Sequence, residues 1–354
     1  MEPNKRILIA PLDWGLGHAT RCIPVIQRLL ARNCVVFIAS SGRALHLLQK
    51  EFPQVKCFEI EAYNPIYPES SLMVFKMALQ LPKFLKTINH EHKQIEKIVE
   101  RNKIDLVISD NRYGCFSTQV KSIIITHQLN IQMPPLFKWM EGRVNRFNEK
   151  KIKQFNECWV PAPEKSFISL LTENSSSLNV KYVGYLSRFE KKMLPAKYDV
   201  CLICSGPEPQ RSMLERIVRT QLKRSNLSSI IVRGKTEAMN KVYKQKQHYN
   251  IMNYMISDEL NQVIEQSDLI ISRSGYSTVM DLAKLNKKAV FVPTPGQTEQ
   301  EYLATELMKN RIAFSTEQDT FDLEEAIAES KKYTGFANFE YEPALLNKAI
   351  DSIL

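Results

Sequence analysis

Short apolar runs alternate with longer amphipathic stretches along the whole chain. Near the amino terminus, residues 6–10 and 35–39 are two such runs, and residues 20–32 between them carry apolar side chains at helical spacing. A strand, a helix and a strand in this order form a right-handed crossover, which makes the two strands parallel. The same alternation continues through three further apolar runs, at residues 104–108, 122–126 and 157–160.

A second set of apolar runs begins after residues 187–197, where we place the hinge between two domains. This second set covers residues 198–205, 229–234, 268–272 and 288–292. Doubly wound parallel sheets bind their ligands at the carboxyl ends of the strands. The pattern therefore predicts an α/β chain of two Rossmann-like, doubly wound domains, residues 1–187 and 188–335, with a ligand cleft between them.

Length and composition agree with this prediction. The 354 residues exceed the size at which a single core stops growing, roughly 250–300 residues. Hydrophobic residues make up 44% and charged residues 24%, which excludes a disordered, collagen-like or disulfide-scaffold protein. Lys and Arg number 48 against 38 acidic residues, a formal net charge of +10. This excess fits a negatively charged partner and fits equally well lysines on solvated helix faces.

The cysteines and the amino terminus indicate the compartment. Cys201 and Cys204 form a C-x-x-C pair, but they lie inside an apolar run, and no second ligand pair completes a zinc site. We therefore expect no bound metal and a reducing environment. The polar first residues lead directly into a strand, and no window approaches 18 apolar residues, so we predict no signal peptide and no membrane-spanning helix. A cytoplasmic location follows.

The loop after the first predicted strand combines glycines with ionisable side chains. Gly15 and Gly17 let the backbone approach a ligand closely, and the following helix offers free N–H groups to an anion. His18 comes directly afterwards and places an imidazole at the floor of the cleft, where it is suited to act as a base or to orient a substrate. The structural alternative is a histidine that only caps the helix. The third glycine of the dinucleotide-binding fingerprint is missing.

Two loops of the second half have related chemistry. In residues 272–281 a strand ends in hydroxyls and a glycine, and the next helix presents N–H groups suited to a phosphate. Asp281, one turn into that helix, is suited to accept two hydrogen bonds from a ribose diol, or merely complements the helix dipole. A Pro/Gly turn then begins a helix whose first turn carries Glu299, Gln300 and Glu301, which suit a polyol such as a sugar ring.

These segments together resemble a known family. Residues 272–304 resemble the carboxyl-terminal domain of the family 28 glycosyltransferases: a hydroxyl–Arg–Ser–Gly turn, an acidic residue one helical turn on, then Pro-x-Pro and a Gln-rich helix start. Residues 15–18 resemble the family's first Gly-rich loop, residues 126–130 its His-Glu-Gln-Asn segment, and residues 184–188 its Gly-to-Arg hinge. Residues 204–206 resemble the second Gly-rich loop.

The resemblance implies a GT-B fold with a UDP-sugar donor in the second domain. It also implies that the last helix, within residues 336–354, packs back on the first domain. The backbone of Met255 and Ile256 would read the uracil, and Asp281 would hold the ribose, although the family usually has Glu there. The diphosphate and the sugar would be contacted by Arg188, Ser205, Gly206, Arg273, Ser274, Gly275, Gln300 and Glu301. Glu301 replaces a family Gln, which leaves the donor sugar open between a hexose and an N-acetylhexosamine.

The residue that takes the acceptor's proton stays open. Gln128 stands where the family has a carboxylate, so this position cannot supply a base. Asp110, at the end of a predicted strand and facing the same cleft as His18, is the first candidate, and Asp13 is the second. Both carboxylates have a purely structural alternative. The acceptor side would be formed by Gly15, Gly17, Arg21, Arg112, His127, Gln128 and Asn130.

We expect no cofactor and no metal in the reaction. No Asp-x-Asp motif lies between apolar strands, so a metal-chelated diphosphate is not predicted. Helix dipoles and arginines would instead stabilise the leaving UDP. An acceptor that approaches from the domain opposite the donor implies inversion in a single displacement.

Two stretches of the first half combine apolar with basic side chains. One is residues 73–99, which include five lysines, and the other is residues 137–153, in which aromatic side chains accompany arginines and lysines. Such a combination is typical of an interfacial patch on anionic lipid, and also of ordinary amphipathic helices with solvated lysines. The expected partners are therefore a nucleotide-sugar donor, a lipid-linked or cell-envelope glycan acceptor and the inner face of the membrane, with no nucleic acid.

Three functions compete at this point. The first is an inverting UDP-sugar hexosyltransferase. The second is a hydrolase, because Gly17-His18-x-x-Arg21-Cys22 also resembles the UDP-sugar hydrolases of nonulosonic acid synthesis, whose loop histidine lies near the attacking water. The third is a non-catalytic nucleotide-sugar-binding subunit. The length of the chain and its basic, apolar first half favour an extended acceptor. We therefore prefer the glycosyltransferase to the hydrolase.

Overall fold

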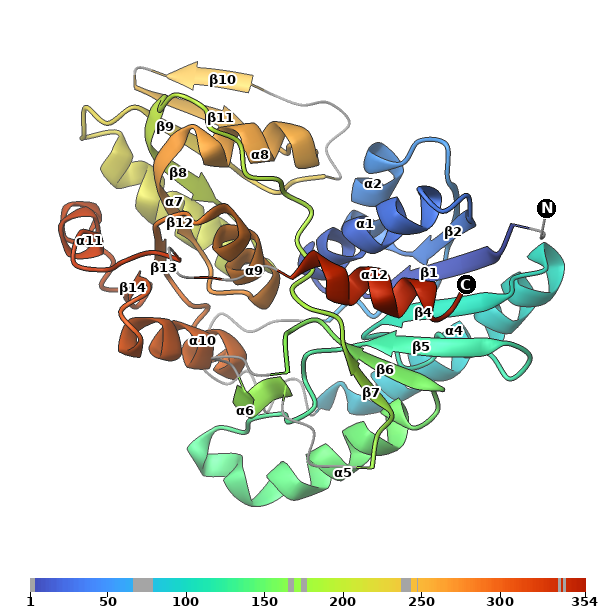
Figure 1. The fold of residues 1–354 in the computed structure, drawn as a ribbon. Helices are drawn as coiled ribbons and strands as arrows, with labels where there is room; N and C mark the ends of the chain where they lie inside the picture. The colour runs from blue at the N-terminus through green and yellow to red at the C-terminus, as the bar shows by residue number, and fades with distance from the viewer. Residues whose placement is uncertain are drawn as a thin grey trace.

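The computed structural model describes residues 4–65, 79–164, 169–172, 177–236, 243–246, 248–336, 339 and 342–354. Its described parts form two α/β domains that lie on either side of a cleft (Figure 1). Each domain is built around one twisted, mostly parallel sheet with helices on both faces. The alternation of apolar runs and amphipathic stretches is thereby confirmed as two doubly wound domains.

The first domain has strand order β3-β2-β1-β4-β5-β6-β7, and all of its strand pairs are parallel. The strands are β1 (Arg6–Pro11), β2 (Val35–Ser40), β3 (Lys56–Glu59), β4 (Leu106–Asp110), β5 (Lys121–Ile125), β6 (Glu157–Val160) and β7 (Val180–Tyr182). The helices are α1 (Gly17–Leu30), α2 (Gly42–Glu51), α4 (Leu81–Asn102), the 3-10 helix η1 (Pro135–Met140), α5 (Glu141–Ile152) and α6 (Ser169–Thr172).

The second domain has strand order β10-β11-β9-β8-β12-β13-β14, in which only β10 and β11 pair antiparallel. The strands are β8 (Tyr198–Ile203), β9 (Ser229–Val232), β10 (Tyr243–Lys246), β11 (Tyr249–Met252), β12 (Ser267–Ser272), β13 (Ala289–Phe291) and β14 (Phe314–Ser315). The helices are α7 (Gln210–Leu222), α8 (Ser257–Glu265), α9 (Tyr276–Leu285), α10 (Thr298–Lys309) and α11 (Leu323–Ser330), and α12 (Pro343–Asp351) follows them in the chain.

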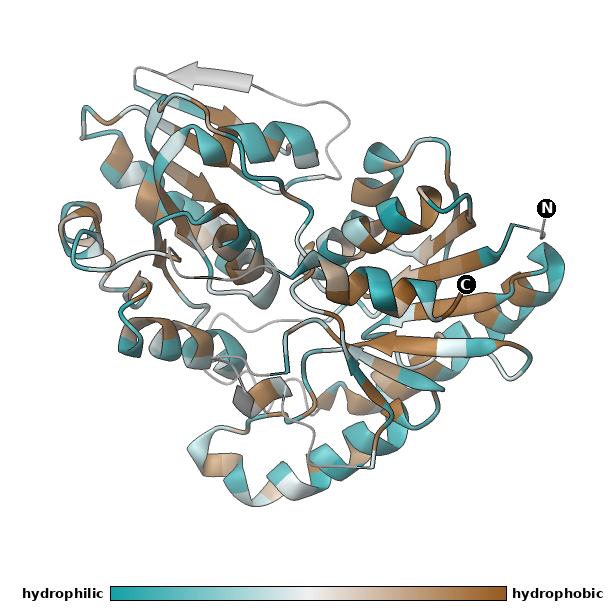
Figure 2. Ribbon diagram, in the orientation of Figure 1, coloured by the Kyte–Doolittle hydropathy of each residue, from teal (hydrophilic) through white to brown (hydrophobic). Residues whose placement is uncertain are grey.

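The central strands are buried on both faces, and this explains their uninterrupted apolar runs. Residues 7–10 of β1 and 106–110 of β4 are fully or almost fully buried. Figure 2 shows the hydrophobic colour concentrated on these strands, while the outer faces of the helices are hydrophilic. Edge strands such as β3 and β10 are short and more polar, so the search for apolar runs does not find them.

The last helix, α12, returns from the second domain to the first (Figure 1). Leu346, Ala349 and Ile350 belong to the same core cluster as the apolar face of α1. On the surface of this contact, Arg32 Nε donates to Asp351 Oδ1 at 2.7 Å. The first domain is therefore completed by residues from the carboxyl end of the chain.

The strand order decides which loops meet at the cleft. In the first sheet the direction of winding reverses between β1 and β4, and in the second between β8 and β12. A crevice opens at such a reversal, beyond the carboxyl ends of the two strands. The loops after β1 and β4 therefore face the loops after β8 and β12 across the cleft.

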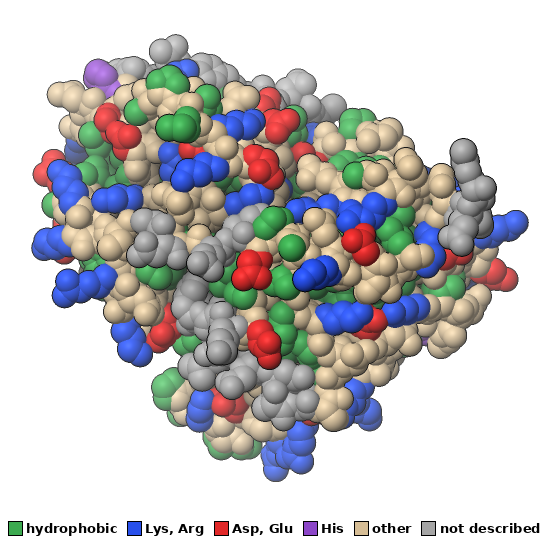
Figure 3. Space-filling view, in the orientation of Figure 1, with side chains coloured by type: hydrophobic (Ala, Val, Ile, Leu, Met, Phe, Trp, Pro, Cys, Tyr) green, Lys and Arg blue, Asp and Glu red, His purple; other side chains and the backbone are tan. Residues whose placement is uncertain are grey.

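The chain carries a formal net charge of +10. Figure 3 shows lysines and arginines distributed over both domains on the face in view. Within the described ranges, no helix has the length and apolar character needed to cross a membrane. Of the predicted interfacial stretch 73–99, residues 73–78 lie outside the described residues, and the rest belongs mainly to α4.

Candidate active site

Two hollows join at the cleft between the domains. The larger one is lined by the loop before α1, the loop after β5 and the first turns of α9 and α10. The smaller one is lined by residues 188–189, by second-domain residues from β8 to α9, and by Leu16, Gly17, Thr20 and Leu47 of the first domain. Ser205, Ser277 and Thr278 border both hollows, so a single elongated ligand can extend from one hollow into the other.

A buried network of ionisable groups lies at the floor of the larger hollow. Asp110, at the end of β4, is fully buried and receives two hydrogen bonds from the Arg21 guanidinium and one from His18 Nδ1 at 2.7 Å. Arg21 Nη2 also lies 2.9 Å from this ring nitrogen, since both groups share Asp110 Oδ1. A carboxylate only accepts hydrogen bonds, so His18 carries its proton on Nδ1 and keeps Nε2 as its basic nitrogen.

The local structure explains why these three side chains meet. The β1–β4 register pairs Pro11 with Asp110, which brings the loop after β1 over the end of β4. Helix α1 begins at Gly17, earlier than the predicted residue 20, because Leu16 already accepts the first helical hydrogen bond from Thr20 N at 2.9 Å. His18 and Arg21 are three residues apart in α1, so both side chains lie on one face of this helix.

The charges in this network set the pKa values. Burial would raise the pKa of Asp110, but Arg21 and His18 outweigh it and lower this pKa from 3.8 to about 2. Burial, reinforced by the neighbouring Arg21 charge, lowers the pKa of His18 below 6.5. At neutral pH Asp110 is therefore ionised and His18 is an uncharged base.

The second domain extends the network through Glu299, in the first turn of α10. Arg21 Nη1 lies 2.8 Å from His127 Nδ1, and His127 Nε2 lies 3.1 Å from Glu299 Oε1. The Gln128 amide donates to the other carboxylate oxygen of Glu299. The His127 ring also stacks on Tyr276 of α9, with centroids 4.0 Å apart. The two domains thus meet directly beside His18.

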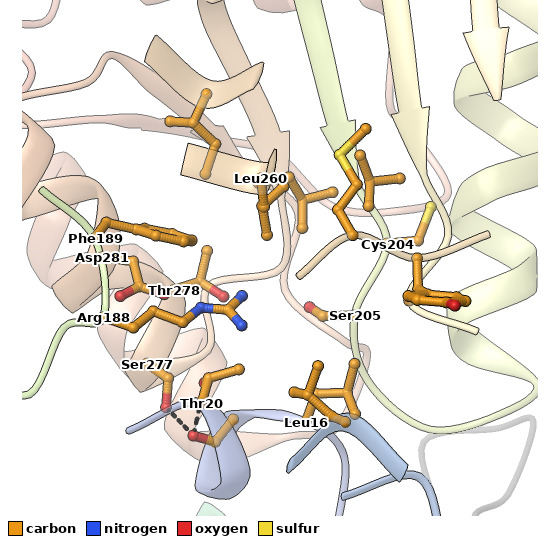
Figure 4. A pocket seen from close by; sticks show the side chains of 18 of the residues that line it. Leu16, Thr20, Arg188, Phe189, Cys204, Ser205, Leu260, Ser277, Thr278 and Asp281 are labelled. Atoms are coloured by element: carbon orange, nitrogen blue, oxygen red, sulfur yellow. Dashed lines mark hydrogen bonds between the residues drawn. The ribbon is translucent and has the colours of Figure 1, made fainter. Parts of the chain in front are cut away.

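The smaller hollow is mostly apolar, and Arg188 and Asp281 are the charged residues of its lining. Figure 4 shows the Arg188 guanidinium extending into it from the side of Asp281, with Ser205 on the opposite wall. Arg188 Nε and Nη1 are buried and have no hydrogen-bond partner among the described residues. Asp281 accepts a hydrogen bond from Ser187 Oγ at 2.6 Å, and burial raises its pKa from 3.8 to about 6. Glu51 Oε1 lies 3.8 Å from Arg188 Nη1, which is an ion pair without a hydrogen bond, so Nε and Nη1 keep their N–H donors for an anionic ligand.

The amino terminus of α9 lies where the two hollows join. Gly275 is the N-cap of this helix, and Ser277 Oγ donates to Gly17 O of the first domain at 2.9 Å. A Cβ at Gly17 would lie 3.0 Å from Ser277 Oγ, so glycine permits this close approach of the domains. Free N–H groups at the start of α9 therefore face the junction of the hollows.

Comparisons with known proteins agree with this geometry. Residues 202–346 match the model of the glycosyltransferase family 28 C-terminal domain, and residues 5–132 match a model described as glycosyl transferase family 1. The chain is therefore a glycosyltransferase, and its carboxyl-terminal part is similar to that domain of family 28.

A curated relative and two solved structures show how far this similarity extends. The UDP-N-acetylglucosamine–N-acetylmuramyl-(pentapeptide) pyrophosphoryl-undecaprenol N-acetylglucosamine transferase of Fusobacterium nucleatum is 22% identical over 88% of this chain and 84% of its own. The glycotransferase of kitacinnamycin superposes with a TM-score of 0.65 at 15% identity, covering 100% of this chain and 99% of that one. Acinetobacter baumannii MurG superposes with a TM-score of 0.57 at 16% identity, covering 99% of both chains. The glycosyltransferase therefore has the expected GT-B fold.

Many of the residues singled out in the sequence line the two hollows of this glycosyltransferase. In the larger hollow these are Gly15, Gly17, His18, Arg21, His127, Gln128, Ser205, Gly206, Gly275 and Gln300. In the smaller hollow they are Arg188, Ser205, Met255 and Asp281. Asp110 lies behind His18 and does not line the cleft, so it is placed to support the histidine and not to meet an acceptor.

Arg273 and Ser274 have other contacts than the predicted ones with a diphosphate. The Arg273 guanidinium is fully buried and donates to four oxygens, among them the backbone carbonyls of Val292 and Pro293 at 3.0 Å. Ser274 Oγ donates to Gln300 O at 2.7 Å. Both side chains hold the loops after β12 and β13 together, and only the neighbouring Gly275 reaches the cleft.

Asp13 and Arg112 are also occupied by the protein itself. Asp13 Oδ2 accepts from Ser41 Oγ at 3.0 Å, and Asp13 lines neither hollow. Arg112 is fully buried and donates to Glu91 Oε2 at 2.8 Å. The structure therefore brings neither Asp13 nor Arg112 into the lining of the two hollows, although Asp13 Oδ1 has no hydrogen-bond partner among the described residues.

The three remaining candidates lie outside the lining of both hollows. Glu301 is exposed and accepts from the Gly296 N–H at 2.8 Å. The Ile256 N–H donates to Glu259 Oε2 at 3.1 Å, within the capping of α8. The Asn130 N–H donates to a backbone carbonyl of α6. A sequence motif locates such a loop correctly but does not predict which of its side chains faces the ligand.

Of two further residues in the centre of the cleft, Tyr276 was not predicted as a site residue, and Glu299 was predicted only as one of three side chains suited to a sugar ring. Glu299 and Tyr276 both contact His127 from the second domain. Their sequence signal is the position next to Gln300 and Gly275, in the first turns of the two helices that begin at the cleft.

Among the described residues, no three His, Cys, Asp or Glu side chains gather as a metal site would require.

Proposed function

We propose that this glycosyltransferase moves a hexose or an N-acetylhexosamine from a UDP-sugar to a hydroxyl of a lipid-linked acceptor, with inversion and without a metal ion. The observation that carries the proposal is the His18–Asp110 pair. It places a neutral imidazole, held by a buried carboxylate, at the floor of the cleft beside the start of α9.

The transfer is a single displacement at the anomeric carbon. The acceptor oxygen forms a bond to this carbon, and the bond from the carbon to the β-phosphate oxygen breaks, so UDP leaves with the electron pair. His18 Nε2 takes the proton from the acceptor hydroxyl. Asp110 stabilises the resulting imidazolium and holds the ring in the tautomer that keeps Nε2 free for this proton.

The donor fits the junction of the two hollows. We place the uridine in the smaller hollow, where Met255 and Leu260 offer apolar walls and Asp281 accepts from the ribose. The diphosphate then lies at the start of α9, where the helix dipole and the Arg188 guanidinium stabilise the charge of the leaving UDP. The sugar points toward Gln300 and His18 in the larger hollow.

An apolar arm of the larger hollow supports a lipid-linked acceptor. Trp14, Tyr63 and Phe84 form an aromatic cluster, with 5.3 Å between the ring centroids of Trp14 and Phe84. The Tyr63 hydroxyl is occupied by a hydrogen bond to Glu91 at 2.6 Å, so this tyrosine presents its ring to the cleft. An arm of this kind suits the hydrocarbon portion of an acceptor.

The mouth of this arm supports docking on a membrane. Leu81 and Phe147 line the mouth and are 48% and 42% exposed. Leu136 and Trp139 of the adjoining η1 are 78% and 69% exposed. We take these residues and Leu79, which is 66% exposed, as one apolar patch, and Arg143 and Lys151 of α5 lie over the rings of Trp139 and Phe147. We propose that this patch rests on the anionic cytoplasmic face of the membrane, where a lipid-linked acceptor would enter the cleft.

Turnover of defined donors tests the chemistry. We would incubate wild type and His18→Gln with a panel of UDP-sugars, with and without membrane lipid extract, and quantify UDP and free sugar. We expect UDP without matching free sugar only when lipid is present, and a loss of about 10²–10⁴-fold in kcat for His18→Gln. UDP binding of the variant should be unchanged. Free sugar that appears in step with UDP would instead indicate a hydrolase.

Flotation on liposomes tests the membrane contact. Anionic vesicles at low salt should recover the wild type, and Leu136→Ala/Trp139→Ala should lose most of this binding. Met193→Ala is the matched control, because Met193 is fully exposed and apolar but lies in the linker between the domains. Equal recovery of all three proteins would exclude the patch as the membrane contact.

A further inference from the structure

Glu299 is the carboxylate that the second domain contributes to the network around His18. It belongs to the first turn of α10 and lines the larger hollow. Its two oxygens contact His127 and Gln128, which follow β5 of the first domain. The contact therefore exists only while the two domains are close together.

The direction of each hydrogen bond follows from the chemistry of the groups. Arginine only donates, so His127 Nδ1 accepts from Arg21 Nη1 at 2.8 Å. His127 Nε2 must then carry the proton and donate to Glu299 Oε1 at 3.1 Å. Arg21 in turn donates to Asp110, which holds His18. An unbroken series of hydrogen bonds thus connects the base in the first domain to Glu299 in the second.

We propose that Glu299 is a positioning residue that couples closure of the two domains to the alignment of His18. The inference rests on the proposed function, because it takes His18 as the base of the transfer. When α10 approaches with the bound donor, the carboxylate fixes the His127 ring, which is 4% exposed and stacked on Tyr276. His127 then holds one end of the Arg21 guanidinium, and Arg21 holds Asp110.

The consequence of losing this carboxylate follows from burial. Without Glu299, the Gln128 amide and the His127 Nε2–H lose their acceptor, and the His127 side chain is so buried that water hardly reaches it. His127 is then free to turn, and Arg21 Nη1 loses a partner while its other nitrogens still bind Asp110. A small shift of Arg21 moves Asp110 and with it the ring of His18, and catalysis depends steeply on such placement.

Two substitutions separate positioning from the other roles that a carboxylate in this cleft can have. Glu299→Ala removes both acceptors and should lower kcat by about 10–100-fold, with the KM values and UDP affinity within about twofold of wild type. Glu299→Gln keeps an oxygen for His127, and the Gln128 amide can turn its own oxygen toward the new NH₂ group. This conservative variant should retain kcat within about fivefold of wild type.

Glu306→Gln is the matched control. Glu306 belongs to the same helix and pairs with Lys309 at 3.4 Å, outside the lining of the cleft. This variant should have wild-type kcat and KM. A raised KM with unchanged kcat in Glu299→Ala would mean that Glu299 binds a substrate hydroxyl directly. Equal losses in Glu299→Gln and Glu299→Ala would mean that the charge itself acts at the reaction centre. Either result overturns the positioning role.

A measurement without turnover keeps this inference separate from the proposed function. We would record the radius of gyration by small-angle scattering with and without saturating UDP. Wild type should become more compact with UDP, and Glu299→Ala should show a smaller change at full occupancy. If wild type transfers no sugar, the proposed function fails while the scattering still tests closure. Equal compaction of the two proteins, with equal kcat, would refute the coupling.

Discussion

Replacing Asp110 with asparagine removes the central charge of the buried network and keeps its shape. Asp110 is fully buried and receives two hydrogen bonds from Arg21, which is 1% exposed. An asparagine has one oxygen that accepts hydrogen bonds, and its NH₂ group faces a donor of Arg21 or His18. The Arg21 guanidinium therefore loses the opposite charge and one of its two acceptors. The substitution therefore tests stability and catalysis at the same site.

The expected loss of stability is several kcal/mol. Breaking a buried ion pair by removing one partner costs about 3–5 kcal/mol, and the remaining oxygen favours the lower end of this range. The fall of the Asp110 pKa from 3.8 to about 2 agrees, since it corresponds to about 2 kcal/mol in favour of the ionised form. For a domain of this size about 3 kcal/mol lowers Tm by roughly 6–12 °C.

The assay compares Asp110→Asn with Asp351→Asn by calorimetry and by single-turnover kinetics. Asp351 also pairs with an arginine, Arg32, at 2.7 Å, but it is 60% exposed. Exposed pairs contribute about 0–1 kcal/mol, so Asp351→Asn should shift Tm by less than about 3 °C and leave kcat unchanged. Asp110→Asn should in addition lower kcat by about 10²–10⁴-fold, because the amide no longer fixes the His18 tautomer.

Two results would refute this reasoning. A Tm within about 2 °C of wild type would mean that Arg21 does not depend on Asp110 for its charge partner. Wild-type kcat in a folded Asp110→Asn protein would mean that His18 does not need this carboxylate, and the base would have to be sought elsewhere in the cleft.

Three further predictions concern the nucleotide hollow and the packing around the site. Arg188→Ala should weaken UDP binding by about 10–100-fold in isothermal titration, because it removes a buried cation whose Nε and Nη1 have no hydrogen-bond partner among the described residues. The raised pKa of Asp281, about 6, means that folding favours its protonated form, so this group lowers stability as pH rises from 3.8 through about 6. The free energy of unfolding should fall by about 1 kcal/mol between pH 5 and pH 7 through this group, and Asp281→Asn should abolish that part of the change. Gly114→Ala should destabilise the first domain by about 1–3 kcal/mol, because the new Cβ would lie 2.2 Å from Ile88 O. Gly142→Ala in α5 is the control, since a Cβ there meets nothing within 4 Å and should not destabilise the domain. The Tm of each variant tests this prediction.

The pattern of apolar runs was sufficient to predict the two domains. Strands buried on both faces, such as β1 and β4, have to be apolar throughout, and this local requirement is visible without any knowledge of the partner strands. The edge strands β3, β7 and β14 are not buried on both faces, so they do not need to be apolar throughout. The search for apolar runs therefore did not find them.

The chemistry of single loops could also be predicted from the sequence. Gly17 followed by His18 predicts a close backbone approach and an imidazole at the start of a helix, and both lie at the cleft. These features need only a strand, a turn and a helix, which are encoded within about fifteen residues. The same holds for Gly275 at the start of α9.

Only the tertiary structure decided which side chains meet. Asp110 reaches His18 because β4 is the neighbour of β1, although 92 residues separate the two side chains in the chain. Arg273 has the right position in its motif, but Nη1 and Nη2 of its guanidinium donate to neighbouring loops of the protein itself. Glu299 joins the site from the other domain. Burial is a property of each residue and leaves its mark on the local sequence, whereas a contact depends on the order of strands and the closure of domains, which no local pattern records.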